Sequence, residues 1–247
     1  MTTLAEISLE VAKQTLDVQT GVATTGAADS LIDGLNLTQN DNWWKNGTVW
    51  LLSGTHAGKV VPVTGYTAST LYFSSLVTSV GLAKYAVARS IIPLSQLILA
   101  INQALEEVRV TGIDATLTGN GATEYTLPAG VAGVVAVELV DASGKASPKT
   151  HTREANGKLI FRSAPSGTIR VYYKTAPAEL SAATDKVNSE INLKWLKWAA
   201  TANALRWGLR VHGNDPVYKF DEFLNEALKK LAGLRPVLGV KLEIRTA

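Results

Sequence analysis

The sequence of 247 residues contains no cysteine and only three histidines. Without cysteine the chain has neither a disulfide framework nor a thiolate metal site. His56, His151 and His212 lie far apart in the sequence, and none falls in an HxxxH or HExxH pattern. Because histidine metal sites use such spacings, we expect no metal and no cofactor, and we assign the histidines to surface or turn positions.

Long apolar runs and a strong net charge are also lacking. The apolar stretch around residues 90–101 is too short to span a bilayer and contains Ser95 and Gln96. No signal-peptide pattern follows Met1, so we expect a soluble intracellular product without a membrane anchor. The net charge of +3 permits contact with nucleic acid, but a dedicated binder usually carries a dense basic stripe.

Catalytic motifs are missing as well. The sequence has no G-x-S-x-G nucleophile elbow. Residues 54–59 (GTHAGK) look like a phosphate-binding loop, but the glycines are one residue too close, and Val60 stands where Ser or Thr would coordinate magnesium. We therefore predict a hairpin loop here, and we expect that the protein is not an enzyme.

Apolar spacing divides the first two thirds of the chain into helical and β segments. Thr3 and Glu6 form a capping box for an amphipathic helix that ends before Gly21, and Pro93 opens a second helix at its preferred first turn. Between these helices the apolar period changes to two, and it does so again within residues 111–174. Both stretches are typical of small antiparallel β units.

The helix predicted over residues 190–212 is apolar on two opposite sides. A surface helix of a monomer needs only one apolar stripe, so we expect its own domain to cover one face and another molecule to cover the other. At roughly 100° per residue, one face holds Ile191, Trp195, Trp198, Ala202, Leu205 and Leu209, and the opposite face holds Leu193, Leu196, Ala200, Ala204, Trp207 and Val211.

A last helix and an alternating tail follow. Asp215 is predicted to cap that helix, with Pro216 as its first residue, so that the two helices form a hairpin. The predicted apolar stripe of the last helix consists of Val217, Phe220, Leu224, Ala227 or Leu228, and Leu231. A lone terminal strand cannot satisfy its own backbone, so we expect the tail to join a sheet edge in its own subunit or a neighbour's. In the tail, Leu238, Val240, Leu242 and Ile244 alternate with Lys241, Glu243 and Arg245.

Together these patterns predict an α+β fold. Its main body is an α-helical hairpin or bundle, joined by two antiparallel β units (sandwich-like or barrel-like) and a C-terminal strand or arm. The predicted domains are a helical adaptor core of residues 1–20, 91–110 and 177–236, an inserted small β domain of residues 21–90, a second β region of residues 111–176, and an extended arm of residues 237–247.

Three stretches of the second half carry a family resemblance: residues 124–144, residues 157–173, and the connector 178–187 with the helix after it, including Gly208. Their order of strand-rich middle, connector and helical hairpin resembles tailed-bacteriophage head-to-tail adaptor proteins, also called connector, neck or head-completion proteins. Residues 24–73 also look like β domains that recur in phage virion proteins.

The resemblance implies a structural virion protein that forms a homo-oligomeric ring, a dodecamer, below the portal protein. Such a ring joins the capsid to a downstream tail or neck protein, and DNA passes through its lumen without sequence-specific binding. The chain would be found in the virion neck, and in the host cytoplasm during assembly. A ring interface is heterologous, and we assign to the interface with other subunits or the portal Trp195, Trp198, Leu196, Trp207, Leu238, Val240, Leu242 and Ile244.

Two other function classes stay open from the sequence. Trp43, Trp44, Trp50 and Tyr72 would suit a sugar-stacking platform in a carbohydrate-binding accessory module, although these tryptophans would equally form the core of a small β unit. Another tail, baseplate or tail-terminator component would differ from an adaptor in ring symmetry and partner rather than in chemistry.

Overall fold

The computed structural model describes residues 2–148, 153–155, 157–213 and 217–237. The chain divides into two compact units: unit 1 comprises Met1–Leu105 and Glu179–Pro236, and unit 2 comprises Glu106–Ala178 and Val237–Ala247. Most of unit 2 is therefore an insertion between two parts of unit 1. Within the described ranges, no helix combines the length and apolar character needed to cross a membrane.

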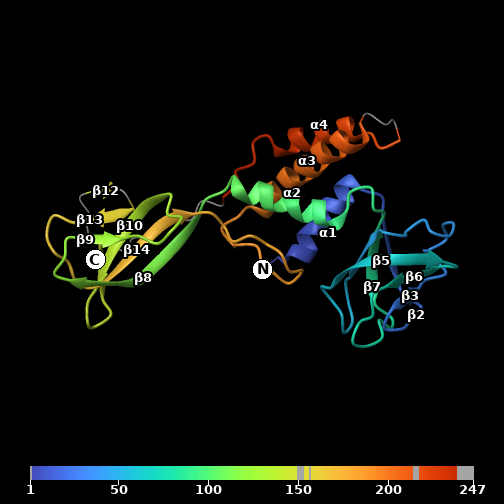
Figure 1. Ribbon diagram of the computed structural model, residues 1–247, viewed down its shortest axis with the longest axis horizontal. Helices are drawn as coiled ribbons and strands as arrows, with labels where there is room; N and C mark the ends of the chain where they lie inside the picture. The colour runs from blue at the N-terminus through green and yellow to red at the C-terminus, as the bar shows by residue number, and fades with distance from the viewer. Residues whose placement is uncertain (1, 149–152, 156, 214–216, 238–247) are drawn as a thin grey trace. The chain divides into compact units, whose positions relative to one another are not determined.

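Seven antiparallel strands of unit 1 form one sheet that curls into a half-barrel (Figure 1). Their order in the sheet is β1-β7-β4-β5-β6-β3-β2. Its interior holds large buried side chains such as Trp44, Tyr66 and Tyr85. The β4–β5 pairing confirms the predicted hairpin loop at residues 54–59. The strands are β1 (Val18–Val22), β2 (Thr25–Gly26), β3 (Ser30–Ile32), β4 (Thr48–Leu51), β5 (Val60–Thr67), β6 (Thr70–Phe73) and β7 (Lys84–Ala88).

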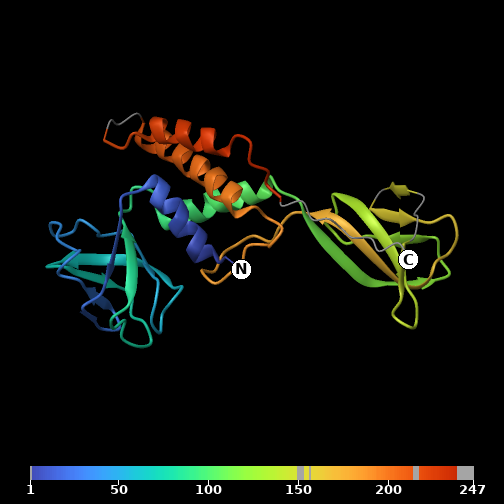
Figure 2. The ribbon, with the colours of Figure 1, turned by 180° about the vertical axis from the view of Figure 1, so that it is seen from behind.

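The helices are α1 (Leu4–Thr15), α2 (Leu94–Glu106), α3 (Leu193–His212) and α4 (Phe220–Leu231), and α2 ends on the first residue of unit 2. The predicted capping box of α1 is confirmed, because Thr3 Oγ1 accepts from the Glu6 N–H while the Thr3 N–H donates to Glu6 Oε2. Figure 2 shows α3 and α4 packed side by side.

The start of α4 differs from the prediction. The helix begins at Phe220, after Lys219 in the left-handed region (φ 49°), and Lys219 makes no side-chain capping bond. The predicted cap, Asp215, and the predicted first residue, Pro216, lie outside the described residues. Val217 precedes the helix rather than forming its apolar stripe.

A close approach between α3 and α4 depends on Gly208. A Cβ atom at this position would lie 3.0 Å from Cζ of Phe220, a side chain that is only 2% exposed. We expect Gly208→Leu to lower the free energy of unfolding by about 1–3 kcal/mol, measured by urea denaturation. Arg206→Leu, on the exposed side of the same helix, is the control. An equal loss in both variants would contradict tight packing at Gly208.

The connector that re-enters unit 1 is fastened to α1 and α2. The Asn102 side-chain amide donates to the Leu180 carbonyl (2.9 Å) and accepts from the Leu180 N–H (3.0 Å). The Leu4 N–H, at the start of α1, donates to the Asp185 carbonyl at 2.8 Å. Asp185 in turn accepts from the backbone N–H groups of Ser181 and Ala182, and these bonds lower the pKa of its carboxyl group.

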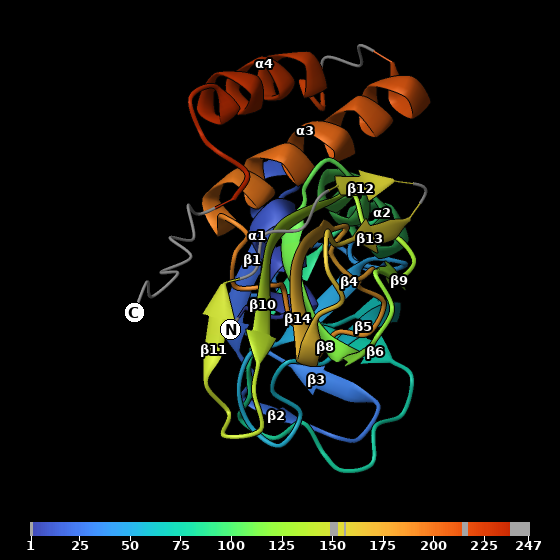
Figure 3. The same cartoon turned by 90° about the vertical axis from the view of Figure 1, so that its left-hand side faces the viewer.

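Unit 2 contains two antiparallel sheets, and Figure 3 shows the strands of the larger one in the order β11-β10-β14-β8. The smaller sheet has the order β12-β13-β9. A common core includes Tyr125 and Phe161, whose rings meet edge to face at 5.8 Å. The strands are β8 (Val110–Asn120), β9 (Glu124–Thr126), β10 (Gly133–Val140), β11 (Ala146–Pro148), β12 (Arg153–Ala155), β13 (Lys158–Ile160) and β14 (Ser166–Thr175).

The predicted α+β class with an α-helical hairpin or bundle as its main body is wrong. The structure is mostly β, and helices form only about a quarter of it. The difference arises partly near the N-terminus, where α1 stops at Thr15 and Val18–Val22 pairs with β7 across the sheet. Helix periodicity is a local signal, whereas this pairing joins residues such as Val18 and Ala88, so the sequence pattern did not show it.

Candidate functional site

The structure buries the middle of both apolar faces of α3 inside unit 1. Trp195, on one face, is 6% exposed, and Leu196, on the other, is 0% exposed. Helices α1 and α4 pack against α3, and Asn203 of α3 donates to the Ala100 carbonyl of α2 at 3.3 Å. The expectation that another molecule must cover one face is therefore wrong for Leu196, because the unit's own helices already enclose it.

The other two predicted interface tryptophans are half-buried. Trp207 lies against His212, with ring centroids 6.1 Å apart. Trp198 lines a hollow on the surface of unit 1. The remaining predicted interface residues, Leu238, Val240, Leu242 and Ile244, lie outside the described residues, and their role stays a prediction.

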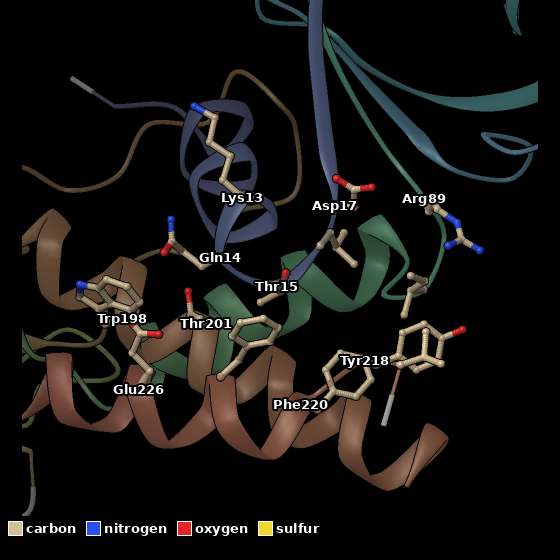
Figure 4. Close-up of a pocket in the computed structure, with 14 residues that line it drawn as sticks. Lys13, Gln14, Thr15, Asp17, Arg89, Trp198, Thr201, Tyr218, Phe220 and Glu226 are labelled. Atoms are coloured by element: carbon tan, nitrogen blue, oxygen red, sulfur yellow. The ribbon is translucent and has the colours of Figure 1, made fainter. Parts of the chain in front are cut away.

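The hollow beside Trp198 has a volume of about 490 Å³, and we call it the aromatic groove. Figure 4 shows side chains from α1, α3 and α4 converging on it. Helix α3 supplies the floor, because α1 and α4 both pack on α3 but make few contacts with each other. The groove is lined by residues 13–17 at the end of α1, by Arg89 and Ile91, by Trp198 and Thr201 of α3, and by Val217, Tyr218, Phe220, Phe223 and Glu226 at and before α4.

The aromatic side of the groove is built around Phe220. Tyr218 stacks on Phe220 with centroids 5.5 Å apart, and His212 lies 5.9 Å from the Phe220 ring. The His212 ring is held at Ile91 by a 3.1 Å contact between Nε2 and the carbonyl oxygen. Phe223, one turn along α4, remains 42% exposed. The groove thus combines a fixed aromatic wall with an open apolar edge.

Four charged side chains line the groove, and two of them already have partners. Lys13 Nζ lies 2.8 Å from Glu10 Oε1, and the Arg89 guanidinium lies 4.3 Å from the centroid of the Trp43 ring. Asp17 and Glu226 form no ion pair with any described residue. The carboxylates are consequently the charges that the groove offers to another molecule.

A second hollow, of about 460 Å³, lies between α2 and α3 and is lined by Gln103, Asn203, Arg206, Leu209 and Arg210. Arg206 donates to the side-chain oxygen of Asn203 at 3.0 Å. Two arginines one helical turn apart fall short of the dense basic stripe that is usual in a nucleic-acid binder.

The tryptophans proposed as a sugar platform do not share a surface. Trp44 is 1% exposed and donates to Gln39, and Trp50 is 1% exposed and donates to Ser8 Oγ of α1 at 3.0 Å. Only Trp43 and Tyr72, each 40% exposed, reach solvent. Trp44 and Trp50 are therefore core residues, and the carbohydrate-binding hypothesis loses half of its proposed platform.

Several ionisable groups with shifted pKa values hold turns and loops together. Burial alone would raise the pKa of Asp33, but hydrogen bonds from Asn36, Tyr85 and Leu35 outweigh burial and lower it. Burial, together with the bond to Asp33, raises the pKa of Tyr85. The pKa of Asp141 is lowered by hydrogen bonds from Ser143 and Lys145 in its turn. None of these groups lines the aromatic groove.

The ring nitrogens of His56 and His212 contact backbone carbonyl groups of other segments. His56 is 4% exposed, and its Nε2 lies 2.8 Å from the Thr78 carbonyl oxygen. His151 lies outside the described residues. In the part of the chain that the structure describes, no three His, Asp or Glu side chains gather as metal ligands would, and no buried side-chain nitrogen or oxygen lacks a hydrogen-bond partner.

Sequence reasoning missed the aromatic groove, although one signal pointed to it. The predicted apolar stripe of the last helix omits Phe223, and a large aromatic side chain outside the packing stripe of a helix indicates a second contact surface. Comparison with known proteins finds no family and no curated protein that matches this sequence.

Proposed function

We propose that this protein is a head-to-tail adaptor of a tailed bacteriophage. In this proposal it forms a homo-oligomeric ring, a dodecamer, below the portal protein, and it joins the capsid to a tail or neck protein. DNA passes through the lumen without sequence-specific binding. The protein would act in the virion neck after assembly in the host cytoplasm, without a membrane, enzymatic activity or cofactor.

The observation that carries this proposal is the open aromatic groove on the helices of unit 1. A protein surface with clustered exposed aromatic and apolar side chains typically marks an interaction site. Phe223 is 42% exposed and Val217 is 77% exposed along one edge of the groove. The resemblance of residues 124–144, 157–173 and 178–187 to phage adaptors supplies the biological setting.

Negative-stain electron microscopy of the purified protein, alone and mixed with detached portal, tests this function. We expect rings with a central hole, or an added layer on the portal, because an adaptor must present two different surfaces that close by rotation. Deleting residues 237–247 is expected to weaken portal binding while far-UV circular dichroism stays unchanged. Monodisperse monomers that also ignore the portal would contradict the proposal.

A further inference from the structure

The aromatic groove presents both apolar and charged side chains to another molecule. The groove has a volume of about 490 Å³. Half-buried Trp198 and exposed Phe223 supply the apolar surface, and the buried Phe220 ring packs behind it. Binding sites for other molecules combine apolar side chains with polar groups that fix orientation, and this groove holds both kinds in about equal share.

The charges of the groove select among apolar occupants. Asp17 and Glu226 form no ion pair with any residue in the described ranges, whereas Lys13 is paired with Glu10 and Arg89 lies over Trp43. An occupant that places cations at the carboxylates therefore fits better than an acidic or purely apolar one. Complementary charge fixes the register of a bound chain, and reversing one charge of a pair adds a repulsion that weakens binding.

The C-terminal sequence of this chain has the required chemistry. Residues 238–247 read LGVKLEIRTA, in which apolar side chains alternate with Lys241, Glu243 and Arg245. Successive side chains of an extended chain point to opposite sides, so one row is apolar and the other is charged, with two cations. The segment follows Pro236, whose carbonyl accepts from the Asn192 N–H at the start of α3.

We propose that the aromatic groove binds residues 238–247 of a second copy of this chain. The apolar row lies on Trp198 and Phe223, and the cations of the other row face Asp17 and Glu226. Ten residues in an extended conformation would span about 33 Å. This inference rests on the proposed ring, in which each copy gives one tail and receives one through a heterologous contact.

The test uses a fluorescein-labelled peptide with the sequence of residues 237–247, titrated with the full-length protein and followed by fluorescence anisotropy. We expect saturable binding that weakens about tenfold or more in Phe223→Ala and in Glu226→Lys. Because Asp17 and Glu226 face cations, a peptide with Lys241→Glu and Arg245→Glu should bind Glu226→Lys more tightly than it binds the unaltered protein.

The same helix offers matched controls for both substitutions. Leu228 is 36% exposed and Glu222 is exposed, and neither lines the groove. Leu228→Ala and Glu222→Lys should leave the peptide affinity within about twofold. No binding, or equal losses in all four variants, would overturn the inference. At concentrations where the full-length protein is monomeric, binding that appears only after residues 237–247 are deleted would assign the groove to the tail of the same chain and overturn exchange between copies.

The outcome for the groove is separable from the outcome for the ring. If rings or portal layers form but the peptide does not bind, the tail–groove contact is wrong and the adaptor function stands. If the peptide binds with the expected variant pattern but neither rings nor portal layers form, the groove assignment stands and the adaptor function fails.

Discussion

Replacing Leu196 with alanine is expected to lower the free energy of unfolding by about 2–5 kcal/mol. Leu196, in the first turn of α3, is 0% exposed, so the shorter side chain leaves a cavity among the helices of unit 1. Urea denaturation followed by circular dichroism, at concentrations where the protein is monomeric, measures the change. The result separates a core role from the interface role that the sequence pattern predicted.

Val211→Ala is the control for Leu196→Ala. Val211 belongs to the same apolar face of α3 but is 55% exposed, so its truncation should change the free energy of unfolding by about 0.5 kcal/mol or less. If Leu196→Ala left monomer stability unchanged and instead abolished ring formation, Leu196 would be an interface residue and the burial of this face would be misassigned.

Replacing Asp33 with alanine is expected to cost about 3 kcal/mol or more, because several donors lose their acceptor together. Asp33 is 0% exposed. Its Oδ1 accepts from the backbone N–H groups of Leu35 (3.0 Å) and Asn36 (3.1 Å), and its Oδ2 accepts from the Tyr85 hydroxyl (2.9 Å). Gly21 leaves room for both the carboxylate and the hydroxyl, since a Cβ there would collide with them. Thermal unfolding of Asp33→Ala beside Tyr85→Phe measures how much of the loss comes from the Tyr85 bond.

The same carboxylate makes stability depend on pH in a defined direction. The pKa of Asp33 in the folded protein lies below its ordinary value of 3.8, so ionised Asp33 contributes its full stabilisation above about pH 4. That contribution is lost as the pH falls through the lowered folded-state pKa. The difference in unfolding free energy between the unaltered protein and Asp33→Asn should therefore be constant near neutrality and shrink in acid. A constant difference down to about pH 2 would contradict the role of Asp33.

Local signals in the sequence predicted local structure well. The capping box at Thr3 and Glu6 and the loop at residues 54–59 are present as predicted, and α2 follows Pro93, whose carbonyl accepts from the Gln96 N–H. Each of these features is determined by side chains within a few residues of one another. The short strands β1, β2 and β3 were not predicted, because Gly- and Thr-rich segments become strands here only by pairing with distant partners.

The candidate site was only partly predictable for the same reason. Apolar periodicity places Trp195 and Leu196 on opposite faces of α3, but periodicity does not tell which molecule covers a face. In the structure the covering elements include α1, about 180 residues earlier in the chain. The aromatic groove joins Asp17, just after α1, with Trp198 of α3 and Glu226 of α4, and this meeting follows from tertiary packing alone.

The two hydrogen bonds between the Asn102 side chain and the Leu180 backbone also bring the two ends of the unit 2 insertion together. The outgoing chain, after Leu105, and the returning chain, at Glu179, are held together by two hydrogen bonds, and the first and last strands of unit 2 pair at Val110 and Thr175. The outgoing and returning chains therefore lie side by side within unit 1, at Asn102 and Leu180, and again within unit 2, at Val110 and Thr175. Closing unit 1 across a shortened insertion would cost little loop entropy, since that cost grows only slowly with loop length. Evolution can thus lengthen, exchange or discard the inserted β unit without redesigning the helices that carry it.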